Sequence, residues 1–254
     1  MTETEHGMTG KPAKSSTERQ TVPGEVRPRK KADARSWSDR LLYCGLNNFF
    51  RLIWMVYFGL RVFQARRYPQ DGAVLICSNH QSHLDPILVG NSSPRYVSFV
   101  ARESLFKLKW FGWIIAALGA FPINRESGLS GVKKTLKRLK NGEMVLIFPE
   151  GTRTPDGEIK EFKPGFCAIA RRAKVPIVPV AIEGAYDAWP KSSWFPTPCP
   201  IHLKVGEPIG VERVAQLSDQ DLTQLVQEAV LNLQMEIRRQ DYSGRSLPDS
   251  KNEH

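Results

Sequence analysis

The sequence predicts an α/β fold: a single domain whose mostly parallel central sheet is flanked by helices, with an N-terminal interfacial membrane-binding helix in front of it. Two observations support this prediction. Short apolar runs alternate along the chain with helical patterns, as they do where crossover helices join parallel strands. The length of 254 residues corresponds to one or two domains, and one compact domain between two polar tails is the simpler solution.

The composition excludes several classes of protein. Lys and Arg number 36 against 26 Asp and Glu, so the formal net charge is +10 and an anionic surface or a polyanion is an expected partner. A mean hydropathy of -0.34 excludes a polytopic membrane protein, and 41% hydrophobic residues exclude a wholly disordered chain. Four separated cysteines, without a Cys-x-x-Cys pair, indicate reduced thiols and neither a zinc framework nor a disulfide scaffold.

The two ends of the chain are expected to be tails. Residues 1–35 are polar and interrupted by prolines, and they lack the basic region and apolar core of a signal peptide, so they predict a disordered tail without a secretion signal. Residues 241–254 predict a second disordered tail. Between them we expect an amphipathic, membrane-associating helical segment at residues 36–68 and a folded domain at residues 69–240.

Residues 41–63 form the first strongly apolar segment of the chain. Its polar side chains fall in one sector when the residues are placed at 100° intervals: Arg40, Asn47, Arg51 and Arg61. We interpret the segment as an interfacial helix, with Trp54 and Tyr57 at the level of the lipid headgroups and the arginines facing anionic lipid. A helix packed on the protein's own core and a helix that spans the bilayer remain open alternatives.

The elements that follow alternate between strands and helices. Strands are expected at short β-rich runs: buried strands at residues 73–78, 144–148 and 176–182, and a further strand at residues 95–101. Helices are expected after Asp85-Pro86, over the apolar stripe of residues 129–139, after Pro164 and after the capping residue Ser218. A short apolar stretch at residues 110–118 cannot span a membrane, and it either lines an acyl pocket or fills the core.

The segment directly after the first buried strand, residues 78–86, is the most informative. Ligand sites in α/β sheets form at the carboxyl ends of strands. His80 can act there as a general base near neutral pH, and Asp85 can hold its tautomer and stabilise the imidazolium ion. The alternative is that Asp85 is only a helix N-cap, followed by Pro86 in the first helical position.

Two further segments contain an arginine in a suggestive position. Glu150, Gly151 and Arg153 follow another buried strand; a glycine permits close backbone approach, and an arginine offers a planar fork for phosphate. A tight surface turn with a solvated arginine is the alternative. Residues 119–125 form an extended apolar run that ends in Arg125, which by itself indicates little because any loop can contain an arginine.

In this order and spacing, the segments resemble the glycerolipid acyltransferase family, that of the 1-acylglycerol-3-phosphate acyltransferases. The resemblance rests on four boxes: Asn-His-x4-Asp at residues 79–85, Gly-x-x-Phe-x-x-Arg at 119–125, Phe-Pro-Glu-Gly-Thr-Arg at 148–153, and Val-Pro-Ile-Val-Pro-Val at 175–180. It covers residues 41–209 and leaves both tails unmatched. Arg102 and Ser104 stand where the family has lysine and glutamate.

The resemblance implies that residues 69–240 are an acyltransferase domain. The enzyme would carry a fatty acyl group from acyl-CoA or acyl-acyl-carrier protein to the sn-2 hydroxyl of 1-acyl-sn-glycerol 3-phosphate, giving phosphatidate in phospholipid biosynthesis. His80 would be the general base, oriented by Asp85. The acceptor's phosphate would be bound by Arg125, Glu150, Gly151 and Arg153, with Arg102 and Lys163 as further candidates. No metal, cofactor or prosthetic group is implied, because the thioester activates the donor.

The implied partners are lysophosphatidate, the acyl donor and an anionic membrane surface, with no nucleic acid, and the implied location is the cytoplasmic face of the inner (plasma) membrane. Another lysophospholipid or glycerol 3-phosphate remains open as the acceptor. Three other interpretations compete: a metal hydrolase using His80, His83 and Asp85; an acyl-enzyme formed on Ser82 or Cys77; and a non-catalytic basic module that binds membranes.

Overall fold

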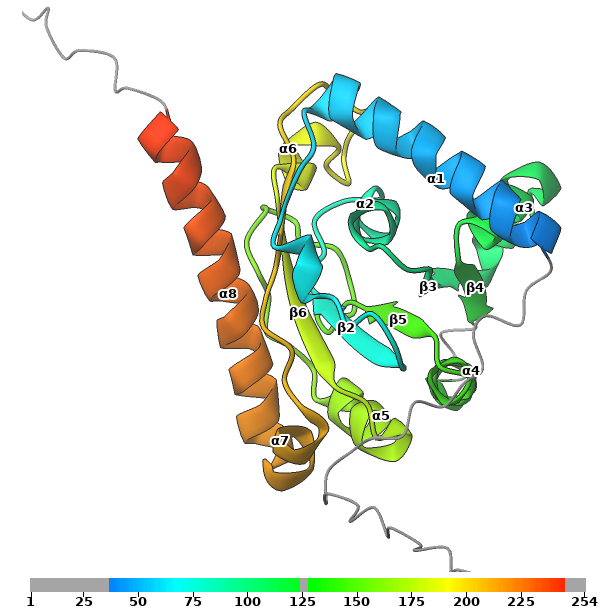
Figure 1. Ribbon diagram of the computed structural model, residues 1–254. Coiled ribbons are helices and arrows are strands. Elements are labelled where there is room, and N and C mark those ends of the chain that lie inside the picture. Colours follow the sequence, from blue (N-terminus) through cyan, green and yellow to red (C-terminus); the bar gives the residue numbers. More distant parts are fainter. Residues whose placement is uncertain (1–36, 124–127, 245–254) are drawn as a thin grey trace, which may run out of the picture.

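The computed structural model describes residues 37–123 and 128–244 (Figure 1). The predicted N-terminal tail and Arg125 lie outside these residues. The last helix, α8 (Asp219–Gly244), continues four residues into the segment that we predicted as a C-terminal tail. Nothing between Asp241 and Ser243 breaks a helix, and the first glycine comes at position 244. The boundary predicted at residue 241 is therefore wrong.

Seven strands form one sheet, in which only one neighbouring pair is antiparallel. Their order is β1 (Arg61–Phe63), β7 (His202–Val205), β6 (Ile177–Glu183), β2 (Val74–Ser78), β5 (Met144–Ile147), β3 (Val97–Arg102) and β4 (Ala120–Ile123). The antiparallel pair is β6–β7. The four predicted strands are β6, β2, β5 and β3, which are consecutive neighbours in the sheet. The predicted α/β fold with a mostly parallel sheet is confirmed.

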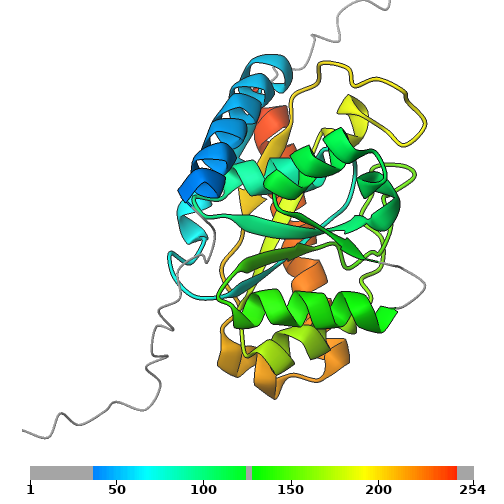
Figure 2. The same cartoon turned by 90° about the vertical axis from the view of Figure 1, so that its right-hand side faces the viewer.

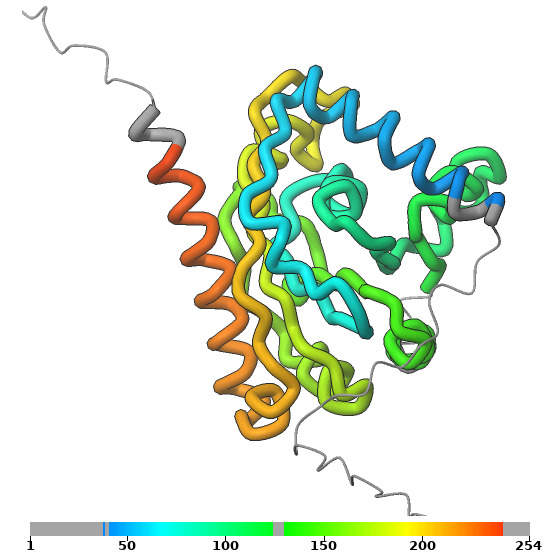
Figure 3. The backbone as a smooth tube through the Cα atoms, viewed as in Figure 1, coloured from blue at the N-terminus to red at the C-terminus, as the bar shows by residue number. Residues whose placement is uncertain are grey.

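Helices cover both faces of the sheet (Figure 1). One face carries α1 (Trp37–Phe58), α2 (Asp85–Ser92), α3 (Lys109–Ala117) and α6 (Ala185–Ala188). The other face carries α4 (Gly128–Lys140), α5 (Gly165–Ala173), α7 (Val211–Gln216) and α8. The short helices η1 (Ala65–Arg67) and η2 (Glu103–Phe106) follow β1 and β3. The tube in Figure 3 shows α1 and α8 on opposite sides of the sheet.

The strand side chains alternate between two hydrophobic cores, one on each face. In β2, Val74 and Ile76 pack with α1 and α2, whereas Leu75 and Cys77 pack with α5 and α8. All four side chains are fully buried. A continuous apolar run is what a strand covered on both faces requires, and this explains why the central strands were visible in the sequence.

The N-terminal helix ends earlier than predicted. It stops at Phe58 because Gly59 turns the chain with a positive φ of 54°, and the N–H of Arg61 then donates to Ile201 O in the neighbouring segment at 3.0 Å. Arg61 therefore lies in β1 and not in the polar sector of a helix. Trp54 was predicted at the level of the lipid headgroups, and this is wrong: its side chain is 6% exposed and stacks on Phe50 in the core.

Helix α1 nevertheless has a second apolar side that faces outward. Trp54 and Phe58 are buried on the core, while the other side of the helix exposes large apolar side chains: Leu41, Phe49, Leu52, Met55 and Val56. Within the described ranges, no helix is both long enough and apolar enough to span a membrane. The helix therefore packs on the core with one side and offers an apolar side to a partner.

Gly119, the first residue of the second box, has a backbone role. Its φ is 111°, a region that favours glycine, and a Cβ atom at this position would lie 2.2 Å from the carbonyl oxygen of Val97. The N–H of Phe99 donates to Gly119 O at 3.0 Å. Gly119 thus allows β4 to begin in close contact with β3, and the box glycine is explained by packing.

Candidate active site

The candidate site lies at the carboxyl ends of three strands in the middle of the sheet. His80 follows β2, Glu150 follows β5, and Glu183 is the last residue of β6. Parallel strands end at the same edge of a sheet, so side chains far apart in the sequence meet there. The N–H of Thr154 donates to His80 O at 2.8 Å, which ties the loop after β5 to the loop after β2.

His80 and Asp85 form the hydrogen-bonded pair at the centre of the site. His80 Nδ1 lies 2.8 Å from Asp85 Oδ2, and the Asp85 side chain is fully buried. The imidazole ring stacks on Phe148, with 3.9 Å between centroids and 12° between planes. Because Asp85 accepts from Nδ1, Nε2 is the ring nitrogen that can take up a proton from a substrate.

Asp85 organises the loop that precedes it. Its Oδ2 also accepts the N–H of Gln81 at 2.6 Å and the N–H of Ser82 at 2.7 Å. Its Oδ1 is buried and has no hydrogen-bond partner among the described residues, so the side chain does not cap α2, although Pro86 occupies the expected first turn. The interpretation of Asp85 as only a helix cap is therefore wrong: the carboxylate turns back toward the loop because three donors converge there.

Glu150 supports His80 from the other side of the loop. It is 3% exposed, and its two carboxylate oxygens accept the N–H of His80 at 2.8 Å and that of Lys160 at 3.4 Å. Burial raises the pKa of Glu150 to about 7, and the two hydrogen bonds oppose this only in part. The family resemblance placed Glu150 among the phosphate-binding residues. In the structure, its carboxylate instead accepts the main-chain N–H of His80.

Arg153 offers a buried hydrogen-bond donor beside the His–Asp pair. Its Nη1 atom is buried, and no residue in the described ranges accepts a hydrogen bond from it. The pKa of Arg153 lies below its ordinary value, chiefly because of burial; the Asp85 carboxylate opposes this shift, and the charge of Arg102 adds to it. Two guanidinium groups near each other, one with an unused donor, form a suitable environment for an anion.

The other predicted phosphate-binding residues lie around Arg153. Gly151 has a positive φ of 74°, and a Cβ atom there would lie 3.5 Å from Lys163 Nζ, so these two residues are neighbours. Arg102 is exposed at the end of β3. Arg125 follows β4 but lies outside the described residues. The structure thus groups Gly151, Arg153 and Lys163 after β5, with Arg102 approaching from β3.

Two residues inside the first box belong to the site although the sequence analysis did not assign them to it. The ring centroid of His83 lies 5.6 Å from that of Trp189, whose main-chain oxygen accepts from Ser82. The pKa of His83 is lowered first by partial burial and next by the charges of Arg153 and His80. Gln81 is 2% exposed and bonds to Asp85 through its main chain. Their position between His80 and Asp85 was the signal available in the sequence.

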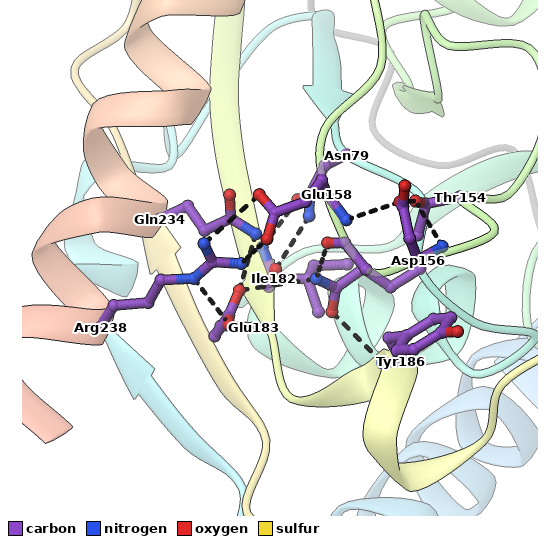
Figure 4. Close-up of polar contacts among 11 residues, drawn as sticks. Asn79, Thr154, Asp156, Glu158, Ile182, Glu183, Tyr186, Gln234 and Arg238 are labelled. Carbon is purple, nitrogen blue, oxygen red and sulfur yellow. Dashed lines mark hydrogen bonds and ion pairs between the residues drawn. The ribbon is translucent and has the colours of Figure 1, made fainter.

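Asn79 fixes the start of the loop to β6. Its Nδ2 donates to Ile182 O, and its Oδ1 accepts the N–H of Ile182, both at 2.8 Å (Figure 4). The side chain is fully buried and satisfies both main-chain groups of Ile182. Asn79 thus positions His80 by continuing the pairing of β2 with β6 beyond the end of the strand.

The competing interpretations find little support in these contacts. Among the described residues, no cluster of three His, Cys, Asp or Glu side chains could hold a metal ion. Cys77 is fully buried in the core, and burial raises the pKa of its thiol. Ser82 Oγ donates to Trp189 O at 3.0 Å. Neither side chain is arranged as a nucleophile activated by His80.

Two cavities lie away from the site. One, of about 350 Å³, is beside α4 and is lined in part by Lys134 and Arg138. The other, of about 720 Å³, is beside α8 and is lined in part by Phe162 and Gln227. His80 lines neither cavity. The candidate site is therefore identified from the side chains that meet around His80 and not from a cavity.

Comparisons with known proteins agree with the boxes and with the fold. The acyltransferase family model matches residues 59–183. A 1-acyl-sn-glycerol-3-phosphate acyltransferase of Bacillus subtilis is 31% identical over 188 residues, which are 72% of this chain and 90% of that protein. One from Pseudomonas aeruginosa is 33% identical over 168 residues, 64% of each chain. The crystal structure of the 1-acyl-sn-glycerophosphate acyltransferase PlsC from Thermotoga maritima is similar with a TM-score of 0.68 and 28% identity, covering 79% of this chain and 82% of that one.

The raised pKa of Glu150 predicts a dependence of stability on pH. The folded-state pKa is about 7 against an ordinary value of 4.5, so the stability that depends on the bound proton is present below 4.5 and is lost as the pH rises through 7. Glu150→Gln cannot ionise. Between about pH 5 and about pH 8 its free energy of unfolding should therefore fall less than that of the wild type, by up to about 3 kcal/mol. Denaturant titrations at both pH values measure this, and a difference that does not change with pH would contradict it.

Proposed function

This chain belongs to the acyltransferase family that includes the 1-acyl-sn-glycerol-3-phosphate acyltransferases, and from that premise we propose that it transfers a fatty acyl group to the sn-2 hydroxyl of 1-acyl-sn-glycerol 3-phosphate. The donor is acyl-CoA or acyl-acyl-carrier protein, and the product is phosphatidate. The observation that carries the proposal is the convergence of the His80–Asp85 pair with the unused buried donor of Arg153.

In the proposed reaction, His80 is the general base. Nε2 removes the proton from the sn-2 hydroxyl while the hydroxyl oxygen attacks the carbonyl carbon of the thioester. A carbon–oxygen bond forms, the carbon–sulfur bond breaks, and the thiolate leaves with the proton that the imidazolium returns. Asp85 fixes the Nδ1–H tautomer and stabilises the imidazolium ion. Glu150 holds the main chain of His80, so we remove it from the proposed phosphate contacts.

The basic residues around Gly151 bind the acceptor's phosphate in this proposal. Arg153 supplies its unused Nη1 donor, Gly151 allows close approach of the backbone, and Lys163 and Arg102 add positive charge. Arg125 is a further candidate from the end of β4. Because the phosphate is covalently linked to the reacting glycerol, binding it holds the hydroxyl close to His80 and raises its effective concentration.

We further propose that an anionic membrane binds across the exposed apolar residues at one side of the molecule. Besides the outer side of α1, they are Trp110 and Trp113 of α3 and Trp194 and Phe195 in the segment 189–201. Figures 1 and 2 show these three elements along the same side, and Tyr57 OH donates to Pro196 O at 3.3 Å. Exposed basic residues accompany them: Arg51, Lys107, Lys109 and Lys191. Aromatic and basic side chains together suit a bilayer surface, which we take to be the cytoplasmic face of the inner membrane.

The proposed mechanism predicts a loss of turnover without a loss of acceptor binding. His80→Ala should lower kcat about 10³-fold or more, and Asp85→Asn about 10²- to 10⁴-fold, because general-base catalysis and its tautomer control are removed. His83→Ala, which removes a neighbouring imidazole, should have a much smaller effect. Initial rates with acyl-CoA and lysophosphatidate measure kcat, and calorimetry measures acceptor binding. Full activity of His80→Ala would remove the mechanism.

The phosphate site predicts a selective effect of Arg153→Gln. Loss of a charge-assisted hydrogen bond should raise the KM for lysophosphatidate about 10- to 100-fold, while slow transfer to monoacylglycerol, which lacks the phosphate, should not change. Arg172→Gln, on the far end of α5, is the matched control. A panel that adds glycerol 3-phosphate and headgroup-bearing lysophospholipids tests the acceptor class. Equal losses with all acceptors would contradict a phosphate contact.

The proposed membrane surface predicts that Trp194→Ala combined with Phe195→Ala weakens binding to vesicles that contain phosphatidylglycerol by about 10-fold or more, since two large apolar side chains would no longer enter the bilayer. Met235→Ala, an exposed apolar residue of α8 on the other side of the sheet, is the control. Vesicle co-sedimentation measures the binding. Turnover of a short-chain, water-soluble acceptor should stay the same, and unchanged vesicle binding would contradict the assignment.

A further inference from the structure

Gln81 connects the candidate active site to two other segments of the chain. Its main-chain N–H donates to Asp85 Oδ2 at 2.6 Å, beside the bond from His80. Its side-chain Nε2 donates to Gly157 O at 3.0 Å, and its Oε1 accepts the N–H of Tyr186 at 3.4 Å. The position of the Gln81 amide group therefore determines where the main-chain donor of the same residue meets Asp85.

The carboxylates around this amide group converge on one arginine. Arg238, near the end of α8, donates from Nε to Glu183 Oε1 at 2.9 Å and from Nη2 to Glu158 Oε1 at 3.1 Å (Figure 4). Glu158 follows Gly157, the main acceptor of the Gln81 amide. Glu183 Oε2 lies 3.5 Å from Gln81 Nε2 and also accepts from Gln234 at 2.6 Å. Arg238 thus holds both segments against which the Gln81 side chain packs.

The charges make this arrangement depend on Arg238. Glu183 ends β6, whereas Glu158 belongs to the loop after β5, and both carboxylates point toward the same guanidinium group. Without that positive charge the two carboxylates would repel each other. The loop that contains Gly157 would then be held by fewer contacts, among them the bond from Tyr186 OH to Pro155 O at 2.7 Å, and the partners of the Gln81 amide would be less firmly placed.

We propose that Arg238 is a positioning residue for acyl transfer: it fixes Glu158 and Glu183, these segments fix the Gln81 amide, and Gln81 fixes Asp85 and hence His80. The inference rests on the proposed role of His80 and Asp85. It adds a helix outside the four boxes to the catalytic apparatus. Asn79 holds the other side of the His80 loop independently, so loss of Arg238 loosens the loop but does not release it.

The chain offers a matched control for this proposal. Arg171 in α5 fastens the opposite end of the same helix, where it pairs with Asp219 and donates to Val214 O at 3.0 Å and Leu217 O at 2.6 Å. Arg171 and Arg238 have similar side-chain exposure, 29% and 36%. Substitution of either arginine removes a partly exposed ion pair that secures α8, but only Arg238 is connected to Gln81.

The test measures kcat and the acceptor KM for Arg238→Gln, Gln81→Ala and the double variant, with the acceptor that the wild type uses best. We expect kcat to fall about 5-fold in Arg238→Gln and about 10-fold in Gln81→Ala, because a misplaced general base slows the chemical step, while KM changes less than about 2-fold. The double variant should resemble Gln81→Ala alone, since both changes act through the same amide group. Arg238→Lys, which keeps the charge, should restore part of kcat.

Arg171→Gln should lower the Tm by about as much as Arg238→Gln does, but it should leave kcat unchanged. An unchanged kcat in Arg238→Gln, a rise in KM alone, or multiplied losses in the Arg238 and Gln81 double variant would each overturn the proposal. If Arg238→Gln does not fold, Glu158→Gln, which removes the same ion pair from the side of the loop, takes its place in the comparison. His80→Ala is assayed in parallel. If His80→Ala is fully active, the proposed mechanism fails. If His80→Ala is inactive but the Arg238 and Gln81 double variant shows multiplied losses, only the role of Arg238 is overturned.

Discussion

The candidate site depends on the buried carboxylate of Asp85. A carboxylate that is taken completely out of water needs hydrogen-bond donors, because a buried polar group without partners costs free energy. Asp85 Oδ2 receives three donors, from His80 Nδ1 and from the main chains of Gln81 and Ser82. To bring them together, the chain must turn sharply after β2. In the proposed mechanism the same turn presents the other nitrogen of the imidazole ring to the substrate, so the hydrogen bonds to Asp85 and the orientation of His80 have one structural cause.

The parallel sheet supplies the supports of that turn. Because β5, β2 and β6 are neighbours that run in the same direction, the residues that follow each strand meet at one edge. Because of this proximity, Glu150 accepts the main-chain N–H of His80, and Asn79 donates to the main-chain oxygen of Ile182 near the end of β6. The antiparallel strand β7 and its neighbour β1 run the other way, and they contribute no residue to the site. Strand direction thus determines which parts of the chain reach the candidate site.

The sequence was sufficient for the centre of the fold and for naming residues that meet at the candidate site, but not for most of the contacts between them. Strands covered on both faces are continuously apolar and were predicted; β1 has only three residues and β7 contains His202 and Lys204, so neither has that pattern. The spacing from His80 to Asp85 allowed their contact but left the helix cap as an alternative, and the family resemblance implied the contact. No spacing predicts that Glu150 accepts from the main chain of His80, or that Arg238 reaches the segments around Gln81, because such contacts arise only when distant strands and helices are assembled.

The double-sided character of α1 relates the fold to the proposed substrate. A helix that buried all its apolar side chains in the core would itself offer no apolar side to lipid, and a spanning helix would have no side to pack on α2. Helix α1 buries Trp54 and Phe58 and exposes Phe49 and Val56, so the helix is itself part of the core. If the exposed side enters the bilayer surface, the rigid packing of the buried side fixes the distance of His80 from the lipid. A lysophosphatidate molecule can then keep its acyl chain among the lipids while its phosphate reaches Arg153, which places the free hydroxyl next to the general base.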